Sequence, residues 1–103
     1  MLEEKFITYI RAEKRYSENT MLSYRRDIRR FVEFQVGSHE QFDPVLVTSD
    51  DIRQWIVSLS KDDKLAPASV NRMVSSVRSF FKWMRKTGSI EKDPFRGIGF
   101  QKM

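Results

Sequence analysis

The segment from residue 67 to residue 87 constrains the fold of this chain more than any other. Seven large apolar residues recur in it at helical spacing and fall within about 120° of arc on a helical wheel. This stripe predicts an amphipathic helix that begins near Pro67 and ends before Gly88, with one face in a hydrophobic core. The residues of the stripe are Val70, Met73, Val74, Val77, Phe80, Phe81 and Met84.

Two helices are predicted before it in the first third of the chain. The first is expected from about Leu2 to Lys14, with Phe6, Ile7 and Ile10 on its apolar stripe. The second is expected to follow an N-cap at Ser17, to run to about Val36 and to stop at Gly37. Its expected core residues are Met21, Tyr24, Ile28, Phe31 and Val32.

A further helix is predicted between residues 48 and 60. Either Thr48 or Ser49 is expected to cap it, and Asp50 and Asp51 suit the positive end of its dipole. Residues 37–48 are expected to form a loop, and residues 88–98 irregular chain. The fold class that follows is all-α, an orthogonal bundle of four to five helices. The apolar stripe of the helix predicted between residues 48 and 60 holds Ile52, Trp55, Ile56 and Leu59.

Length and composition exclude several classes of protein. The 103 residues suffice for one compact domain, and the lack of cysteine excludes disulfides and thiolate metal sites. No apolar run approaches the roughly 18–20 residues of a membrane span, so we expect no membrane partner. His39 stands alone in a polar loop, and no phosphate-binding loop or nucleophile motif occurs. We therefore expect no metal, no cofactor and no catalysis by the chain alone.

Positive charge is distributed unevenly along the chain. The net charge is +5, and residues 67–103 hold eight basic and two acidic residues, whereas residues 37–66 hold three basic and six acidic ones. This asymmetry within one small domain favours a binding face for a polyanion and a separate non-binding face.

The polar arc of the helix over 67–87 is suited to the major groove of DNA. Small serines allow close approach of the backbone, while Arg and Asn can reach base edges and phosphates. Arg72 and Arg78 are expected to contact DNA without disturbing the core, since they lie opposite the apolar stripe. An ordinary solvated helix face is the alternative. The arc holds Asn71, Arg72, Ser75, Ser76, Arg78, Ser79, Lys82 and Lys86.

The helix over 17–36 carries a weaker signal of the same kind. Arg25, Arg26, Arg29 and Arg30 lie mostly away from its apolar stripe, and a polar helix N-terminus can hold a phosphate. Solvated arginines with a pair to Asp27 inside the helix are an equally good interpretation. For Trp83, on the polar side of its helix, we favour packing under a neighbouring loop over a contact with DNA or another subunit.

Two runs of residues resemble a known family. The run Ser17-Glu18-Asn19-Thr20, followed by residues 24–31, resembles the amino-terminal SAM-like domain of Xer-type tyrosine recombinases and phage integrases. Residues 68–72 and 75–81 resemble the fourth helix of that domain, and residues 88–94 its exit turn. The resemblance extends from about Phe6 to Ile98.

The resemblance implies a core-binding domain over residues 1–98 that forms half of a C-shaped clamp on duplex DNA. Residues 99–103 would begin the linker to a catalytic domain, which carries the catalytic set of the family. The implied partners are the recombination site and other recombinase subunits in a tetramer, with the isolated domain monomeric. The implied DNA contacts are Thr20, Arg25 and Arg26 near phosphates, and Ser69, Asn71, Arg72, Ser75, Arg78 and Lys82 towards the groove.

Function is therefore expected to be sequence-specific DNA binding within a site-specific recombinase of bacterial or mobile-element origin, in the cytoplasm. The pattern does not divide its contacts between bases and phosphates. A helical protein-interaction module that uses an aromatic surface, without DNA binding, is the alternative from a different class. An independent enzyme is disfavoured because no active-site constellation is present.

Overall fold

A computed structural model describes residues 2–37 and 42–98, and every regular element within these ranges is helical. The first helix, α1, continues without a break into a short π-helix, η1. A single 3-10 turn, η2, precedes α3. The elements are α1 (Leu2–Tyr9), η1 (Ile10–Lys14), α2 (Glu18–Val36), η2 (Pro44–Leu46), α3 (Ser49–Lys61) and α4 (Pro67–Lys86).

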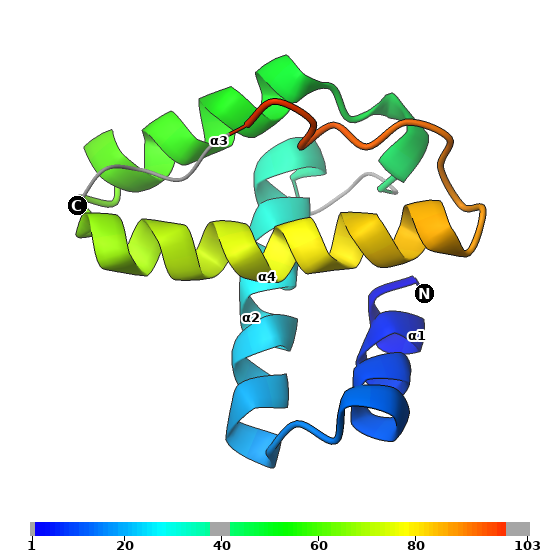
Figure 1. Ribbon diagram of the computed structural model, residues 1–103. Helices are drawn as coiled ribbons and strands as arrows, with labels where there is room; N and C mark the ends of the chain where they lie inside the picture. Colours follow the sequence, from blue (N-terminus) through cyan, green and yellow to red (C-terminus); the bar gives the residue numbers. More distant parts are fainter. Residues whose placement is uncertain (1, 38–41, 99–103) are drawn as a thin grey trace.

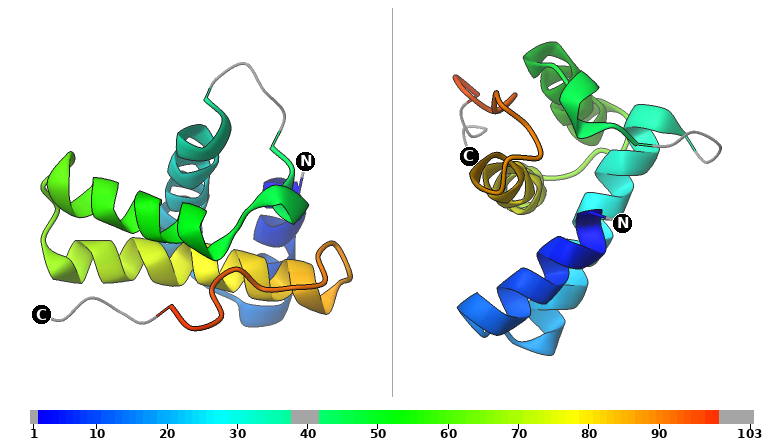
Figure 2. Two further views of the ribbon diagram at one scale, coloured as in Figure 1. Left: turned by 90° about the horizontal axis from the view of Figure 1, so that it is seen from above. Right: turned by 90° about the vertical axis from the view of Figure 1, so that its right-hand side faces the viewer.

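The four α-helices form two hairpins that lie crosswise. Figure 1 shows α1 and α2 side by side, with α4 running across both of them and α3 alongside α4. The two further views in Figure 2 show the same crosswise arrangement. The predicted orthogonal all-α bundle is thus confirmed, with four α-helices and no strand in the described residues.

The core is built around α4, which contacts α1, α2 and α3. The predicted stripe from Val70 to Met84 is buried, and each of its seven apolar residues is at most 1% exposed. Aromatic rings meet edge to face at the centre, where Phe31 of α2 lies 5.0 Å from Trp55 of α3 and 5.7 Å from Phe81 of α4. A well-packed core of this kind fixes the surface of α4 rigidly against the other helices.

The ends of the helices follow the predicted capping chemistry. Ser17 accepts a hydrogen bond from the backbone N–H of Thr20, and Gly37 ends α2 with a positive φ of 69°. Thr48 is the cap of α3, in a reciprocal capping box with Asp51. Ser49, the other candidate cap, instead donates a hydrogen bond to the carbonyl of Pro94.

The chain after α4 is irregular, as predicted, over residues 87–98. It returns along α4 and is held there by two buried side chains, Ile90 and Phe95. His39 and the predicted linker over residues 99–103 lie outside the described residues. Within those residues, no helix is long and apolar enough to cross a membrane.

The environments of two side chains on α4 differ from those predicted from the sequence. Ser76, which was assigned to the polar arc of α4, is only 5% exposed because α2 crosses α4 at that point. Trp83 does pack against a neighbour, but the neighbour is α1 rather than a loop: its ring lies 5.6 Å from Phe6 and 6.2 Å from Tyr9.

Candidate nucleic-acid interface

The crossing of α2 and α4 brings several polar residues of both helices together in one region, which we call the α2–α4 corner. The residues of the corner lie on the faces of α2 and α4 that are turned towards the crossing. From α2 they are Thr20, Ser23, Tyr24, Arg26 and Asp27, and from α4 they are Arg72, Ser75, Ser76, Ser79 and Lys82.

A buried carboxylate lies at the centre of the corner. Asp27 is 0% exposed, and its Oδ2 accepts a hydrogen bond from Nη1 of Arg72 at 3.1 Å and from Oγ of Ser76 at 2.9 Å. The expected partner of Asp27 inside α2 was wrong, because its partners come from α4. A buried carboxylate that is shielded from water is costly unless it is paired. Because its partners belong to α4, this contact joins α2 to α4.

Arg72 therefore has two environments. Its side chain is 49% exposed, which leaves part of the guanidinium accessible, while Nη1 is held by Asp27. The expectation that Arg72 lies clear of the core is corrected by this pair, since its loss would leave a buried carboxylate short of a partner.

The N-terminal half of α2 adds hydroxyl groups to the corner. The hydroxyls of Ser17 and Thr20 lie 2.9 Å apart at the helix start. The rings of Tyr16 and Tyr24 are stacked with centroids 5.6 Å apart. Burial raises the pKa of the Tyr24 phenol above 10.0, and Tyr16 adds to the rise while Ser79 opposes it. Tyr24 therefore keeps its proton at neutral pH and remains a hydrogen-bond donor.

The structure separates two arginines that are adjacent in the sequence. Arg25 turns towards α1, where its Nη2 lies 3.1 Å from Oε2 of Glu4. Arg26 is exposed and shares its helix face with Arg30, four residues on. Arg30 pairs at 3.2 Å with Asp63, in the loop that leads into α4, so this face of α2 turns towards the start of α4. Only Arg26 of the two adjacent arginines belongs to the corner.

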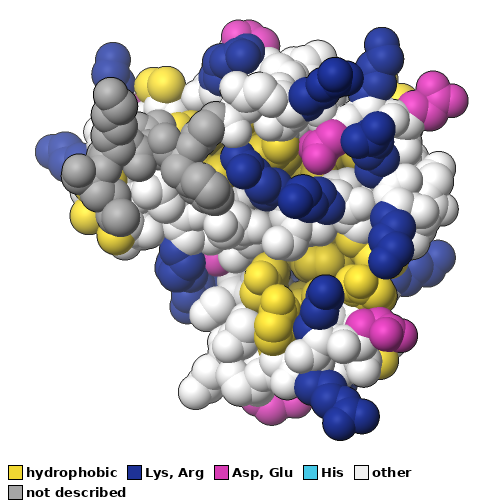
Figure 3. Space-filling view, in the orientation of Figure 1, with side chains coloured by type: hydrophobic (Ala, Val, Ile, Leu, Met, Phe, Trp, Pro, Cys, Tyr) yellow, Lys and Arg dark blue, Asp and Glu magenta, His cyan; other side chains and the backbone are white. Residues whose placement is uncertain are grey.

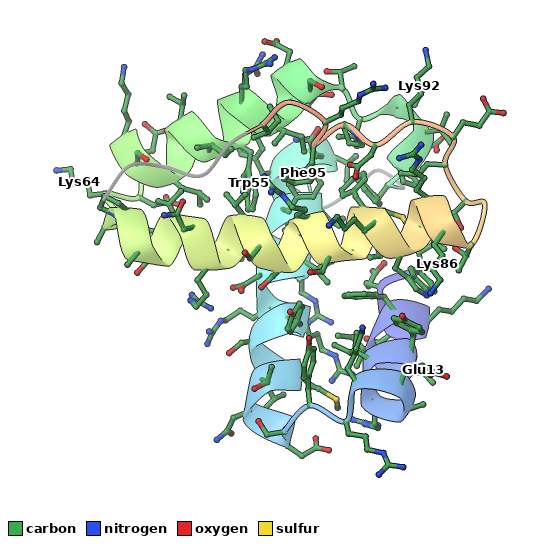
Figure 4. The ribbon with its side chains drawn as sticks, viewed as in Figure 1. Glu13, Trp55, Lys64, Lys86, Lys92 and Phe95 are labelled. Atoms are coloured by element: carbon green, nitrogen blue, oxygen red, sulfur yellow. The ribbon has the colours of Figure 1, made fainter. Side chains whose placement is uncertain are left out.

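The remaining predicted contacts on α4 lie on different parts of its surface. Lys82 is exposed, and Ser69, Asn71 and Ser75 are partly exposed. Arg78 is also partly exposed, but its Nη2 donates a 2.6 Å hydrogen bond to the carbonyl of Ile98, and its guanidinium lies 5.7 Å from the centre of the Phe95 ring. Arg78 thus binds the segment that follows α4. Figure 4 shows Phe95 on that side of α4.

A hollow of about 250 Å³ adjoins the corner between α1, α2 and α4. Figure 3 shows hydrophobic side chains gathered below α4, with basic side chains among and around them. Lys86 reaches from the end of α4 towards α1, where its Nζ lies 6.0 Å from the centre of the Tyr9 ring. The charged residues that line the hollow are all lysines: Lys14, Lys82 and Lys86.

Asp27, Tyr16 and Lys14 are the parts of this region that the sequence did not single out as functional. The sequence does contain one indication for Asp27, which is an acidic residue between two pairs of arginines in the same helix. Among the described residues, no group of three or more His, Cys, Asp or Glu side chains could hold a metal ion.

The fold and the corner define an all-α domain with basic and hydroxyl side chains at one helix crossing, and the comparisons identify its family. Residues 4–88 match the phage integrase N-terminal SAM-like domain, and the chain belongs to this family. The predicted resemblance is thus confirmed. No solved structure gives a significant match to the chain.

Proteins named as tyrosine recombinases are similar to this chain along nearly its whole length. The chain is 33% identical over 100 residues to tyrosine recombinase XerC of Leptospira interrogans serogroup Icterohaemorrhagiae serovar copenhageni, covering 97% of the chain and 32% of that protein. It is 34% identical to tyrosine recombinase XerC of Listeria welshimeri over 98% of the chain, and 33% identical to tyrosine recombinase XerD of Listeria innocua over 90% of it. These two alignments cover 33% and 31% of the relatives. The chain spans about a third of the length of these relatives.

Proposed function

We propose that this chain binds duplex DNA through the α2–α4 corner, as the N-terminal half of the clamp of a site-specific tyrosine recombinase. The observation that carries the proposal is the exposed arc of α4. Between Pro67 and Lys86 the helix has five basic residues and no acidic one. A rigid, basic helix face with small serines is the chemistry that enters a major groove.

The division of roles within the corner follows from exposure and charge. Arg26, Arg72 and Lys82 are exposed cations, and we assign them to phosphates, with Arg72 also able to reach a base edge. Ser69, Asn71 and Ser75 would face the groove, and Thr20 would lie near a phosphate at the start of α2. Arg25 and Arg78, the other two predicted contacts, each already have a partner within the domain, so we propose that they contribute less to DNA binding than Arg26 and Arg72 do.

The bond-breaking chemistry of the recombinase would belong to the part of the relatives that this chain does not cover. The other proposed partners are further recombinase subunits assembled on the same DNA. The isolated chain is expected to leave the topology of supercoiled plasmid unchanged, because only binding is assigned to it.

Two adjacent arginines give a matched test of this proposal. Arg25→Ala and Arg26→Ala remove the same charge from neighbouring positions, but the side chains lie on different sides of α2. Affinity for a short labelled duplex, measured by fluorescence anisotropy over a series of salt concentrations, should fall for Arg26→Ala and its salt slope should drop by about one unit. Arg25→Ala should bind nearly as the unmodified chain does. Binding without salt dependence, or equal effects of both substitutions, would contradict the proposed corner.

A protein-interaction module is the second candidate, and the hollow between α1, α2 and α4 favours it. Its lining includes the rings of Tyr9, Tyr16, Tyr24 and Trp83, which suit an apolar partner surface. A module of this kind would show no salt-dependent DNA affinity in the same anisotropy experiment.

A further inference from the structure

Asp27 is an unusual residue to find at zero exposure. Only two polar residues are buried in the described parts of the chain, and the other, Ser76, is one of its hydrogen-bond partners. A buried ion pair is rarely better for stability than apolar residues of similar volume. The crossing of α2 and α4 could therefore be held by apolar packing alone, and the carboxylate calls for another explanation.

The geometry of the pair is asymmetric in a way that suits a binding role. The Asp27 side chain is 1% exposed and the Arg72 side chain 49%. The carboxylate accepts a hydrogen bond from one nitrogen of the guanidinium, Nη1, on the protein side. The guanidinium has five N–H donors in a fixed fork, so the rest of the fork remains for a ligand on the solvent side.

Anchoring of this kind lowers the cost of binding. A free arginine loses rotamer freedom when it contacts a ligand, whereas one that is already held by a carboxylate has lost that freedom during folding. Ser76 supports the arrangement, because its hydroxyl lies 2.9 Å from the same Asp27 oxygen and 3.3 Å from the Arg72 carbonyl.

We infer that Asp27 is a positioning residue for DNA binding: from inside the α2–α4 corner it holds the Arg72 guanidinium in the orientation that contacts DNA. The inference rests on the proposed function. It goes beyond that proposal by giving an acidic, buried residue a favourable role in binding a polyanion.

Charge and positioning make opposite predictions for Asp27→Asn, which provides the test. The substitution preserves shape and removes one negative charge near the proposed DNA face. If charge alone mattered, the variant would bind duplex DNA more tightly. If Asp27 positions Arg72, affinity should fall about two- to tenfold, the range expected from added side-chain ordering. Glu33→Gln is the matched control, since it makes the same charge change at an exposed position of the same helix.

A double-mutant cycle with Arg72→Ala separates positioning from general damage to the fold. Once Arg72 is absent, Asp27→Asn should cause no further loss of affinity, because the side chain that it positions is missing. Additive losses would show that Asp27 acts through the fold as a whole and would overturn the inference. Tighter or unchanged binding by Asp27→Asn would also overturn it.

A measurement on the unmodified chain keeps the inference testable if a variant fails to fold. Side-chain NMR of Arg72 should show slow rotation of the guanidinium before DNA is added. A freely rotating Arg72 in the DNA-free chain would refute positioning. Failure of the proposed function is distinguishable, because the unmodified chain would then bind no duplex at all, whereas failure of this inference alone leaves that binding and its dependence on Arg72 intact.

Discussion

Arg78 of α4 and Phe95 of the exit segment form a contact in which the guanidinium lies 5.7 Å from the ring centre. The same guanidinium donates to the carbonyl of Ile98 at 2.6 Å. One side chain thus fastens the chain that leaves α4 back onto that helix, and binding of DNA through Arg78 would compete with this contact.

Substitution of Arg78 should therefore act mainly on the exit segment. Arg78→Ala is expected to lower the free energy of unfolding by about 1 kcal/mol, because a hydrogen bond and a cation–π contact are lost together. Amide hydrogen exchange at Phe95 and Ile98 should become faster, while DNA affinity should fall less than for Arg72→Ala. Arg96→Ala, an exposed change of equal charge in the same segment, is the control. A DNA-affinity loss as large as that of Arg72→Ala, with unchanged exchange, would assign Arg78 to DNA instead.

Arg72→Ala should reduce stability as well as binding. Its removal leaves the buried Asp27 carboxylate with the Ser76 hydroxyl but without its cationic partner, and we expect a loss of about 1–3 kcal/mol in the free energy of unfolding. Denaturant titration followed by circular dichroism measures this directly. Lys82→Ala removes the same charge from an exposed site of the same helix and should leave the unfolding midpoint in place. Equal midpoints for both variants would show that the Asp27 pair contributes nothing to stability.

Lys82→Ala should instead affect the ionic part of DNA binding. An exposed ammonium can contact a phosphate but reads no base, so affinity should weaken on all duplex sequences alike. The slope of log affinity against log salt should fall by about one unit. Lys5→Ala, on the exposed side of α1, is the comparison. A loss confined to one sequence, or an equal effect of Lys5→Ala, would remove Lys82 from the proposed interface.

The Tyr24 phenol should be visible in an alkaline titration. Its pKa is raised in the folded chain, so its contribution to stability is complete below pH 10.0 and is lost as pH rises through the folded-state value. Absorbance at 295 nm should show part of the tyrosine signal titrating late. Tyr24→Phe should remove that late part and flatten the fall in stability over the same pH range. A late phase that persists in Tyr24→Phe would place the raised pKa on another tyrosine.

Local pattern was enough to predict the helices but not the pairing between them. The apolar stripe of α4 and the caps at Ser17 and Gly37 depend on nearby residues, and the structure agrees with them. Asp27 and Arg72 meet only because α2 and α4 cross at that point. The apolar periodicity of each helix does not predict where the two helices cross. Ser76 lies at the edge of the apolar arc, where the neighbouring helix decides whether a side chain is buried.

The two sides of α2 could not be distinguished from the sequence either. Arg25 and Arg26 both lie off the apolar stripe, so a helical wheel treats them alike. The position of α1 makes them different, because Glu4 of α1 pairs with Arg25. The role of Arg78 was missed for a similar reason, since its partner belongs to a segment with no regular structure.

The central place of α4 has a consequence for how the domain can meet a ligand. The helix proposed to face the groove also contacts each of the other three α-helices, and its inner face is buried in the core. It cannot slide or tilt by itself without opening the apolar interior, which would cost far more than a typical contact contributes. If this face of α4 binds DNA as proposed, adjustment to different DNA shapes must therefore come from side-chain rotamers, or from reorientation of the whole domain as a rigid body on the duplex.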